Sequence, residues 1–146
     1  MRTEVIPAEA EHCRLLAEAI NGAEDYPWGR DFILEHWDVE PEQGLEDSLE
    51  RSPLCWSILV DGELAGMFGC MEDGQAWITT GPAIDRVKLR FIRQSKPYIE
   101  KMAERFGKVY ACAHSDNAPL IHWLRWTGFE YAGQEGVFEI WVYQLY

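Results

Sequence analysis

The chain has 146 residues, 47% of them hydrophobic, with seven Trp, six Tyr and six Phe, which excludes a disordered chain and fits one domain. Its formal net charge of −12 argues against nucleic-acid binding, because neutralising phosphates requires a basic surface. No apolar run approaches the roughly 18 residues that cross a bilayer, and the N-terminus lacks the apolar core of a signal peptide. We therefore expect a single cytoplasmic domain over residues 1–146, with neither a membrane nor a nucleic acid as its partner.

The N-terminal third predicts one strand and three helices. TEVIPA is a short strand that Pro7 ends, and residues 8–21 carry apolar side chains at helical spacing. Asp31 is placed to cap a short helix that bears several aromatic side chains, and a second short helix is expected over 44–50. This third is also strongly acidic, because residues 1–50 contain fourteen Asp and Glu against three Arg.

A three-stranded meander follows the helices. Apolar runs at 55–60, 64–72 and 75–80 are separated by two Asp-Gly pairs, which are typical of tight turns between antiparallel strands. Gly66 and Gly69 lie inside the second of these strands, where glycine indicates a bulge or a close approach of another backbone.

The next segment, 85–106, predicts a basic helix. Pro97 lies inside it, so we expect either a kink or two consecutive helices. Eight of the thirteen basic residues lie in 86–108, namely Arg86, Lys88, Arg90, Arg93, Lys96, Lys101, Arg105 and Lys108. Two interpretations stay open: a solvated face, or a docking face for an acidic protein partner, including the acidic N-terminal third of a neighbouring copy.

The C-terminal part predicts strand, helix and two further strands. VYACA (109–113) is apolar throughout, which is typical of a central strand buried on both faces. One of the residues 115–117 caps a helix over 118–127, and the last two strands turn at Glu135-Gly136. A meander, a helix, a buried strand and another helix indicate an α/β (α+β) fold, with a mixed sheet and helices on both of its faces.

The segment NAPLIHWLRWTGF carries a resemblance to a known family. It has an Asn, apolar or aromatic residues four, six and seven positions later, and Gly-Phe at eleven and twelve; the residues are Asn117, Ile121, Trp123, Leu124, Gly128 and Phe129. This pattern, together with the element order, resembles the GNAT acyltransferase superfamily. The resemblance implies a mixed, mostly antiparallel sheet of six to seven strands, in which 75–80 and 109–113 are parallel neighbours.

Two departures from that family bear on its cofactor, coenzyme A. Active members hold the pyrophosphate with backbone amides of a glycine-rich loop at a helix N-terminus. The matching stretch here, TTGPAIDR (79–86), has one glycine, then Pro82, which has no N–H, and then Asp85, whose charge repels a diphosphate. Many members also place at the position of Leu124 a Tyr that protonates the departing thiolate, and leucine cannot.

The resemblance therefore implies two functions. The run WITT, the basic helix and the N-x-x-x-I-x-W-L-x-x-x-G pattern resemble a phage and prophage family that includes the small internal virion protein of short-tailed coliphages. On that basis we expect a non-catalytic module, virion- or assembly-associated, with no cofactor. The alternative is an acetyl-CoA-dependent N-acetyltransferase, in which Gly81, Arg86, Lys88 and Asn117 would contact the cofactor.

Candidate catalytic groups are few, and each has a simpler interpretation. Glu72, beside Asp73, lies where a general base could stand, but a carboxylate before a glycine is typical of a turn. Tyr131 is a candidate acid in place of Leu124, as is Tyr110. Asn117 is more simply a helix cap than a cofactor ligand.

We expect the histidines and cysteines to have structural roles rather than catalytic or metal-binding ones. His114 and His122 lie beside a strand end and on a helix, where a lone histidine is commonly structural. The four cysteines are scattered without any CxxC pair, which favours buried free thiols and no metal site.

Overall fold

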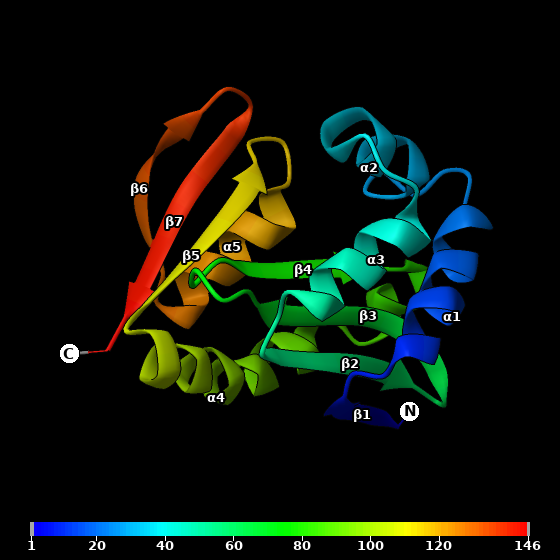
Figure 1. The fold of residues 1–146 in the computed structure, drawn as a ribbon, viewed down its shortest axis with the longest axis horizontal. Coiled ribbons are helices and arrows are strands. Elements are labelled where there is room, and N and C mark those ends of the chain that lie inside the picture. The colour runs from blue at the N-terminus through cyan, green and yellow to red at the C-terminus, as the bar shows by residue number, and fades with distance from the viewer. Residues whose placement is uncertain (1, 146) are drawn as a thin grey trace. The chain divides into compact units, whose positions relative to one another are not determined.

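The structure is a computed structural model that describes residues 2–145 (Figure 1). These residues form seven strands, five α-helices and one short 3-10 helix. In chain order they are β1 (Thr3–Pro7), α1 (Ala10–Asn21), α2 (Arg30–Trp37), α3 (Pro41–Glu50), β2 (Leu54–Val60), β3 (Glu63–Cys70), β4 (Ala76–Thr80), η1 (Pro82–Arg86), α4 (Lys88–Phe106), β5 (Lys108–His114), α5 (Ala118–Thr127), β6 (Glu130–Glu135) and β7 (Phe138–Gln144).

The contacts divide the chain into two compact units. One comprises Met1–Gly69 with Ile78–Lys88, and the other Cys70–Trp77 with Leu89–Tyr146. The strands accordingly form two sheets, one in the order β1-β2-β3-β4 and one in the order β5-β7-β6. Across the described part of the chain, no helix has the length and apolar character that a membrane span requires.

In the first unit, the chain doubles back at Asp61 and Gly62. Both residues have positive φ, 49° and 82°, which a tight turn of this kind requires and which an Asp-Gly pair tolerates. β1 runs antiparallel to β2, with Thr3 opposite Val60. The fully buried side chains of this unit include Leu16, Ile20, Ile58, Val60 and Met67.

A buried polar contact joins α1 to β2. The backbone N–H of Glu9 donates to Nδ1 of His12 at 3.0 Å, so this nitrogen is an acceptor and the Ser57 hydroxyl, 2.7 Å away, donates to it as well. Ser57 is fully buried and His12 is 6% exposed. Because unsatisfied polar groups at this depth would be costly, the contact fixes where helix α1 starts on the sheet.

The expectation of a close backbone approach at the glycines inside β3 is met at Gly69. A Cβ built on Gly69 would lie 2.5 Å from the carbonyl oxygen of Leu54 and 3.1 Å from Cα of Cys55. Real Cβ atoms are not found so close to backbone, so any side chain here would push β2 away from β3.

In the second unit, β7 lies between β5 and β6 and is antiparallel to both. The expectation that 75–80 and 109–113 are parallel neighbours holds only at their start. There Gln75 forms a parallel bridge with Tyr110, whose N–H donates to the carbonyl of Gly74 at 2.9 Å. Beyond this bridge the two strands belong to different sheets.

Helices α4 and α5 are joined through one serine. The indole N–H of Trp123 donates to Oγ of Ser95 at 2.8 Å, and this hydroxyl donates in turn to the carbonyl of Ile92 at 2.8 Å. The ring of Trp123 also stacks on Phe91, with centroids 6.3 Å apart. Ser95 is 1% exposed, so its hydroxyl has no competing water.

Two expectations about element boundaries were wrong, and a third holds at a different residue. Helix α2 begins after Gly29, before Asp31, which therefore does not cap it. Helix α3 begins three residues earlier than expected, because Pro41 occupies its first turn, where a missing N–H costs nothing. The basic segment does form two consecutive helices, but they separate at Val87, and Pro97 lies inside the continuous α4.

The expectation that strand 109–113 is buried on both faces was also wrong. Burial alternates along β5, with Val109, Ala111 and Ala113 buried and Tyr110 and Cys112 exposed. An uninterrupted apolar run therefore does not mark a strand covered on both faces here, because apolar residues also occupy exposed positions, as Tyr110 and Cys112 do.

We predict that Ser95→Ala destabilises the protein by about 1–3 kcal/mol, because it leaves the indole N–H of the half-buried Trp123 without its acceptor, the fully buried Ser95 hydroxyl. Urea unfolding measures this, and Gln94→Ala, an exposed position in the same helix, is the control and should stay within about 0.5 kcal/mol. The double variant with Trp123→Phe should be less than additive, because the donor is then gone as well. Additive losses, or a neutral Ser95→Ala, would contradict the link.

Candidate functional site

The stretch that corresponds to the phosphate loop of the resembled family is η1 with its flanking residues, 81–87. Pro82 has no N–H, and three other amides are already engaged: Gly81 donates to Ala65 at 2.9 Å, Ile84 to Gly81 at 3.2 Å and Val87 to Ile84 at 3.1 Å. The loop therefore closes on itself and on β3, and these amides are not available to an anion.

Gly81 is packed inside the first unit. It is buried, and a Cβ at this position would lie 3.2 Å from Cδ1 of Leu16 and 3.8 Å from Cβ of Ala19. The neighbouring Ala83 and Ile84 are 5% and 6% exposed. A glycine that lets a ligand approach the backbone would face open space, whereas Gly81 faces α1.

Both cations proposed for a cofactor are close to carboxylates. The guanidinium of Arg86 pairs with the carboxylate of Glu63, and Nζ of Lys88 lies 3.7 Å from Oδ1 of Asp85. All four side chains are about half exposed, so these pairs contribute little to stability. They do mean that each cation has a negative neighbour within the chain itself.

A tyrosine that sequence reasoning did not assign lies at the same end of β4. The hydroxyl of Tyr26 is 2.5 Å from Oγ1 of Thr80, which fixes the loop after α1 to the residue before Gly81. Burial raises the pKa of Tyr26, the hydrogen bond to Thr80 lowers it, and the charge of Asp85 raises it. Tyr26 is therefore neutral at physiological pH and can act as a hydrogen-bond donor. No sequence signal could have paired residues that are 54 positions apart.

Asn117 has the capping role that the simpler interpretation assigned to it. Its side-chain oxygen accepts a hydrogen bond from the N–H of Leu120 at 3.2 Å at the N-terminus of α5. The oxygen of this carboxamide is therefore already engaged by a hydrogen bond within the chain. Leu124, at the family's acid position, is 1% exposed and lies in the core.

Glu72 and Asp73 lie in the turn between β3 and β4. Oδ1 of Asp73 accepts a hydrogen bond from the N–H of Gln75 at 3.0 Å, and the N–H of Gly74 donates to Met71 at 2.9 Å. Glu72 is exposed, like Asp73. These contacts are those of a turn carboxylate, and none of them involves the side chain of Glu72.

The remaining candidates lie in the second unit. Tyr131 is 55% exposed and its ring meets Trp141 edge to face, with centroids 5.7 Å apart. Nδ1 of His114 accepts the N–H of Asp116 at 3.1 Å, whereas His122 lies on the exposed face of α5. The described contacts do not bring these side chains together with Arg86 or Asn117.

The buried His12–Ser57 pair resembles part of a hydrolase triad, with Glu9 3.6 Å from Nε2 of His12. Its geometry excludes that chemistry. Ser57 is fully buried, so its oxygen cannot reach a substrate, and Nδ1 of His12 already accepts a backbone N–H. The pair is an anchor for α1.

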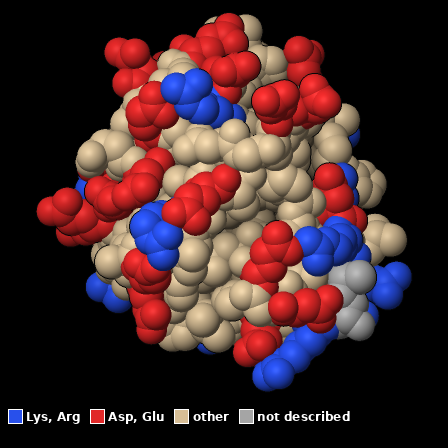
Figure 2. All heavy atoms as spheres, turned by 90° about the vertical axis from the view of Figure 1, so that its right-hand side faces the viewer, with Lys and Arg blue, Asp and Glu red and all other residues tan. Residues whose placement is uncertain are grey.

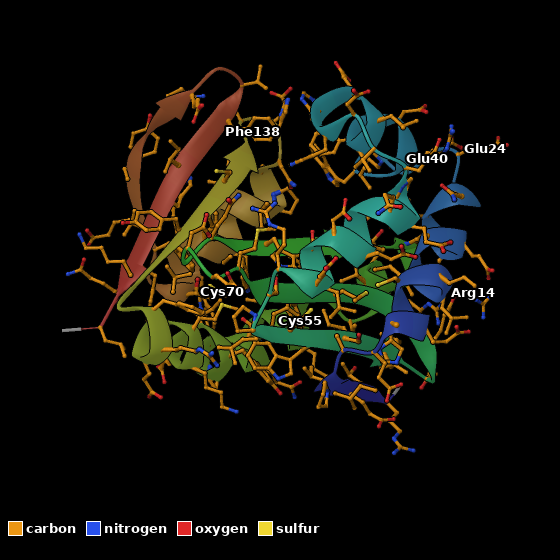
Figure 3. All side chains as sticks on the ribbon, in the orientation of Figure 1. Arg14, Glu24, Glu40, Cys55, Cys70 and Phe138 are labelled. Carbon is orange, nitrogen blue, oxygen red and sulfur yellow. The ribbon has the colours of Figure 1, made fainter. Side chains whose placement is uncertain are left out.

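The four cysteines are free thiols. Cys55 is the second residue of β2 and Cys70 is the last residue of β3 (Figure 3), while Cys13 lies inside α1 and Cys112 lies on the exposed face of β5. Burial raises the pKa of all four, to about 12 for Cys55 and Cys70. Within residues 2–145, no three His, Cys, Asp or Glu side chains are grouped so that they could hold a metal ion.

Known structures share the fold. No protein-family model and no curated protein matches the sequence. The PaiA N-acetyltransferase of Thermoplasma acidophilum, solved in complex with coenzyme A, is 14% identical with a TM-score of 0.68, over 99% of this chain and 100% of that one. An aminoglycoside acetyltransferase in complex with coenzyme A is 15% identical with a TM-score of 0.66, over 98% of this chain and 95% of that one.

A probable acetyltransferase of the GNAT family from Chromobacterium violaceum is also 15% identical, with a TM-score of 0.67 over 99% of this chain and 88% of that one. The chain therefore has the fold of the GNAT acetyltransferases, which confirms the expected fold class. At these identities the similarity establishes the fold, and a fold does not by itself fix an activity.

We predict that Cys112 is the first thiol to react with iodoacetamide, because it alone is exposed. A pKa near 12 leaves Cys55 and Cys70 with about a thousandfold less thiolate at pH 8 than an ordinary thiol of pKa 9, and their reactivity should rise only as the pH approaches 12. Peptide mapping after timed alkylation measures this. Cys112→Ser should remove the fast phase, and equally fast labelling of Cys70 would contradict the placement of these thiols.

Proposed function

We propose that this chain is a phage- or prophage-type protein that uses the GNAT fold as a protein-contact module, virion- or assembly-associated, rather than as an acyltransferase. The observation that carries the proposal is the loop at 81–87, in which the amides of Gly81, Ile84 and Val87 donate within the chain and Pro82 has no N–H to offer. The phage resemblance of the basic helix and of the segment 117–129 supplies the biological setting. The protein would then act in the host cytoplasm and, in a phage, as part of the virion.

The loop argues against a tightly bound coenzyme A on energetic grounds. Each charge-assisted hydrogen bond to a phosphate contributes on the order of 1.5–3 kcal/mol. Gly81, Ile84 and Val87 would have to give up their present acceptors, Pro82 cannot donate, and Asp85 adds a like charge beside the anion. Losing two such bonds weakens binding by two orders of magnitude or more, because about 1.4 kcal/mol is a factor of ten.

Side chains are the remaining route to a cofactor. Arg86 and Lys88 are exposed enough to leave Glu63 and Asp85 at little cost, since exposed ion pairs contribute only about 0–1 kcal/mol. Ordering two long side chains on a phosphate nevertheless costs rotamer entropy, which the backbone of a preformed loop does not. The residues present therefore fit coenzyme A poorly, and we derive no catalytic step through it.

The second candidate is an acetyl-CoA-dependent N-acetyltransferase acting on an unknown amine. It is favoured by the structural neighbours, two of which were solved in complex with coenzyme A. On this hypothesis, Gly81, Arg86, Lys88 and Asn117 would hold the cofactor, and Glu72 or Tyr131 would have to move a proton. The buried Leu124 and the turn contacts around Glu72 speak against it.

Calorimetric titration separates the two candidates. We predict no saturable binding of acetyl-CoA or free coenzyme A at micromolar concentrations, and no acetylation of generic amines. Pro82→Gly together with Asp85→Asn should strengthen binding, because the pair restores a possible N–H donor and removes a like charge.

A dissociation constant in the low micromolar range for the native chain would contradict the proposal. If Arg86→Ala with Lys88→Ala then abolished binding, side chains would replace the loop and the acetyltransferase would become the first candidate. Arg2→Ala is the matched control, because Arg2 is an exposed arginine that likewise pairs with a glutamate, Glu4.

A further inference from the structure

Charge is unevenly distributed over the two units. The first holds seventeen Asp and Glu against six Lys and Arg, and the second holds eight against seven, so nearly all of the net charge of −12 belongs to the first. Acidic side chains gather on the face on which α1 lies (Figure 2). The basic residues of the second unit are concentrated on α4.

The outward side of α4 carries three exposed cations, which we call the basic face and define as Arg93, Lys101 and Arg105; the acidic residues Glu100 and Glu104 lie in the same sector of the helix. The spacings of eight and four residues place the three cations on one side of the helix. In the described part of the chain none of these cations forms an ion pair. Lys101 and Arg105 instead lie over the rings of Tyr98 and Phe106, at 5.4 and 5.6 Å, which partly orders both side chains.

Helix α3 carries the opposite pattern, an acidic face that we define as Glu42, Glu46 and Glu50. These residues are one turn apart and exposed, and within residues 2–145 none of them forms an ion pair. Carboxylates four positions apart on a helix repel one another, so α3 holds two unfavourable pairs. A cationic surface placed against α3 would turn that repulsion into attraction.

Part of the basic face has the spacing of the acidic face. Arg93 and Lys101 are eight residues apart, as Glu42 and Glu50 are, or about 12 Å at 1.5 Å per residue, and Arg105 lies one turn beyond. One chain thus presents two different and complementary surfaces on separate helices. Each surface can pair only with the other kind of surface on a second copy, because neither of them is complementary to itself.

We propose that the basic face of α4 in one copy docks on the acidic face of α3 in a second copy. This inference deepens the proposed function, on which it rests, by naming the partner as the chain itself. The association is weak and sensitive to salt, because exposed ion pairs contribute little individually and are screened within about 10 Å at 0.1 M salt. The net charge of −12 opposes it at long range, so only the matched faces bring two copies together.

Charge reversal tests the proposal by sedimentation velocity at about 50 mM salt, over a range of protein concentrations. The native chain should sediment faster as its concentration rises, and about 0.5 M salt should abolish this, because the screening length then falls to about 4 Å. Arg93→Glu with Lys101→Glu should abolish it at low salt, and so should Glu46→Lys with Glu50→Lys. Glu130→Lys with Glu135→Lys, which makes the same change in net charge as the α3 reversal but on exposed β6 positions, should leave it intact.

Mixing the two reversed variants is the decisive arm. Neither variant should associate alone, but the mixture contains two complementary pairs: the reversed α4 of one variant with the reversed α3 of the other, and the unchanged α3 of the first with the unchanged α4 of the second. Both variants remain negatively charged overall. The mixture should therefore associate. A native chain that is monomeric at all concentrations would overturn the proposal and point to a foreign acidic partner, and so would a mixture that fails to associate. Coenzyme A titration is independent of this result, so failure of the contact and failure of the proposed function are distinguishable.

Discussion

The hydrogen bond from Gly81 to Ala65 constrains the whole region after β4. It ties the loop to β3, while the missing side chain lets Leu16 of α1 pack directly against the loop. Once that contact is made, the chain can turn only through a short 3-10 helix, whose amides point back to its own carbonyls. The same residues cannot satisfy both this packing and a bound diphosphate. The packing inside the first unit therefore determines what the loop can bind.

Buried polar contacts position the helices where apolar packing alone would leave their register open. Ser57 and His12 fix α1, and Ser95 with Trp123 fixes α5 on α4. In each case one hydroxyl supplies the specific contact within an otherwise apolar surface. The arrangement resembles that of catalytic groups, yet both hydroxyls are out of reach of a ligand. Proximity of a serine to a histidine is evidence of chemistry only where the serine is accessible.

Local chemistry allowed part of this structure to be predicted from the sequence. The Asp61-Gly62 turn, the cap at Asn117 and the close approach at Gly69 each follow from the residue type at that position. The burial of β5 was misjudged because apolarity does not report which face of a strand is covered. The contact between Tyr26 and Thr80, and the hydrogen bond from Gly81 to Ala65, depend on segments far apart in the chain, and no local pattern encodes them.

The absent side chain at Gly69 also bears on how this sequence can change over time. Its backbone lies against Leu54 and Cys55 so closely that alanine, the smallest possible replacement, already collides with main chain rather than with a flexible group. A neighbouring side chain could shrink to accommodate a new residue, but a main-chain carbonyl cannot. Drift at this position therefore needs a simultaneous shift of β2, which single substitutions do not supply. Gly69 should remain glycine in descendants of this chain for as long as the two strands stay paired, whatever activity the surface acquires or loses.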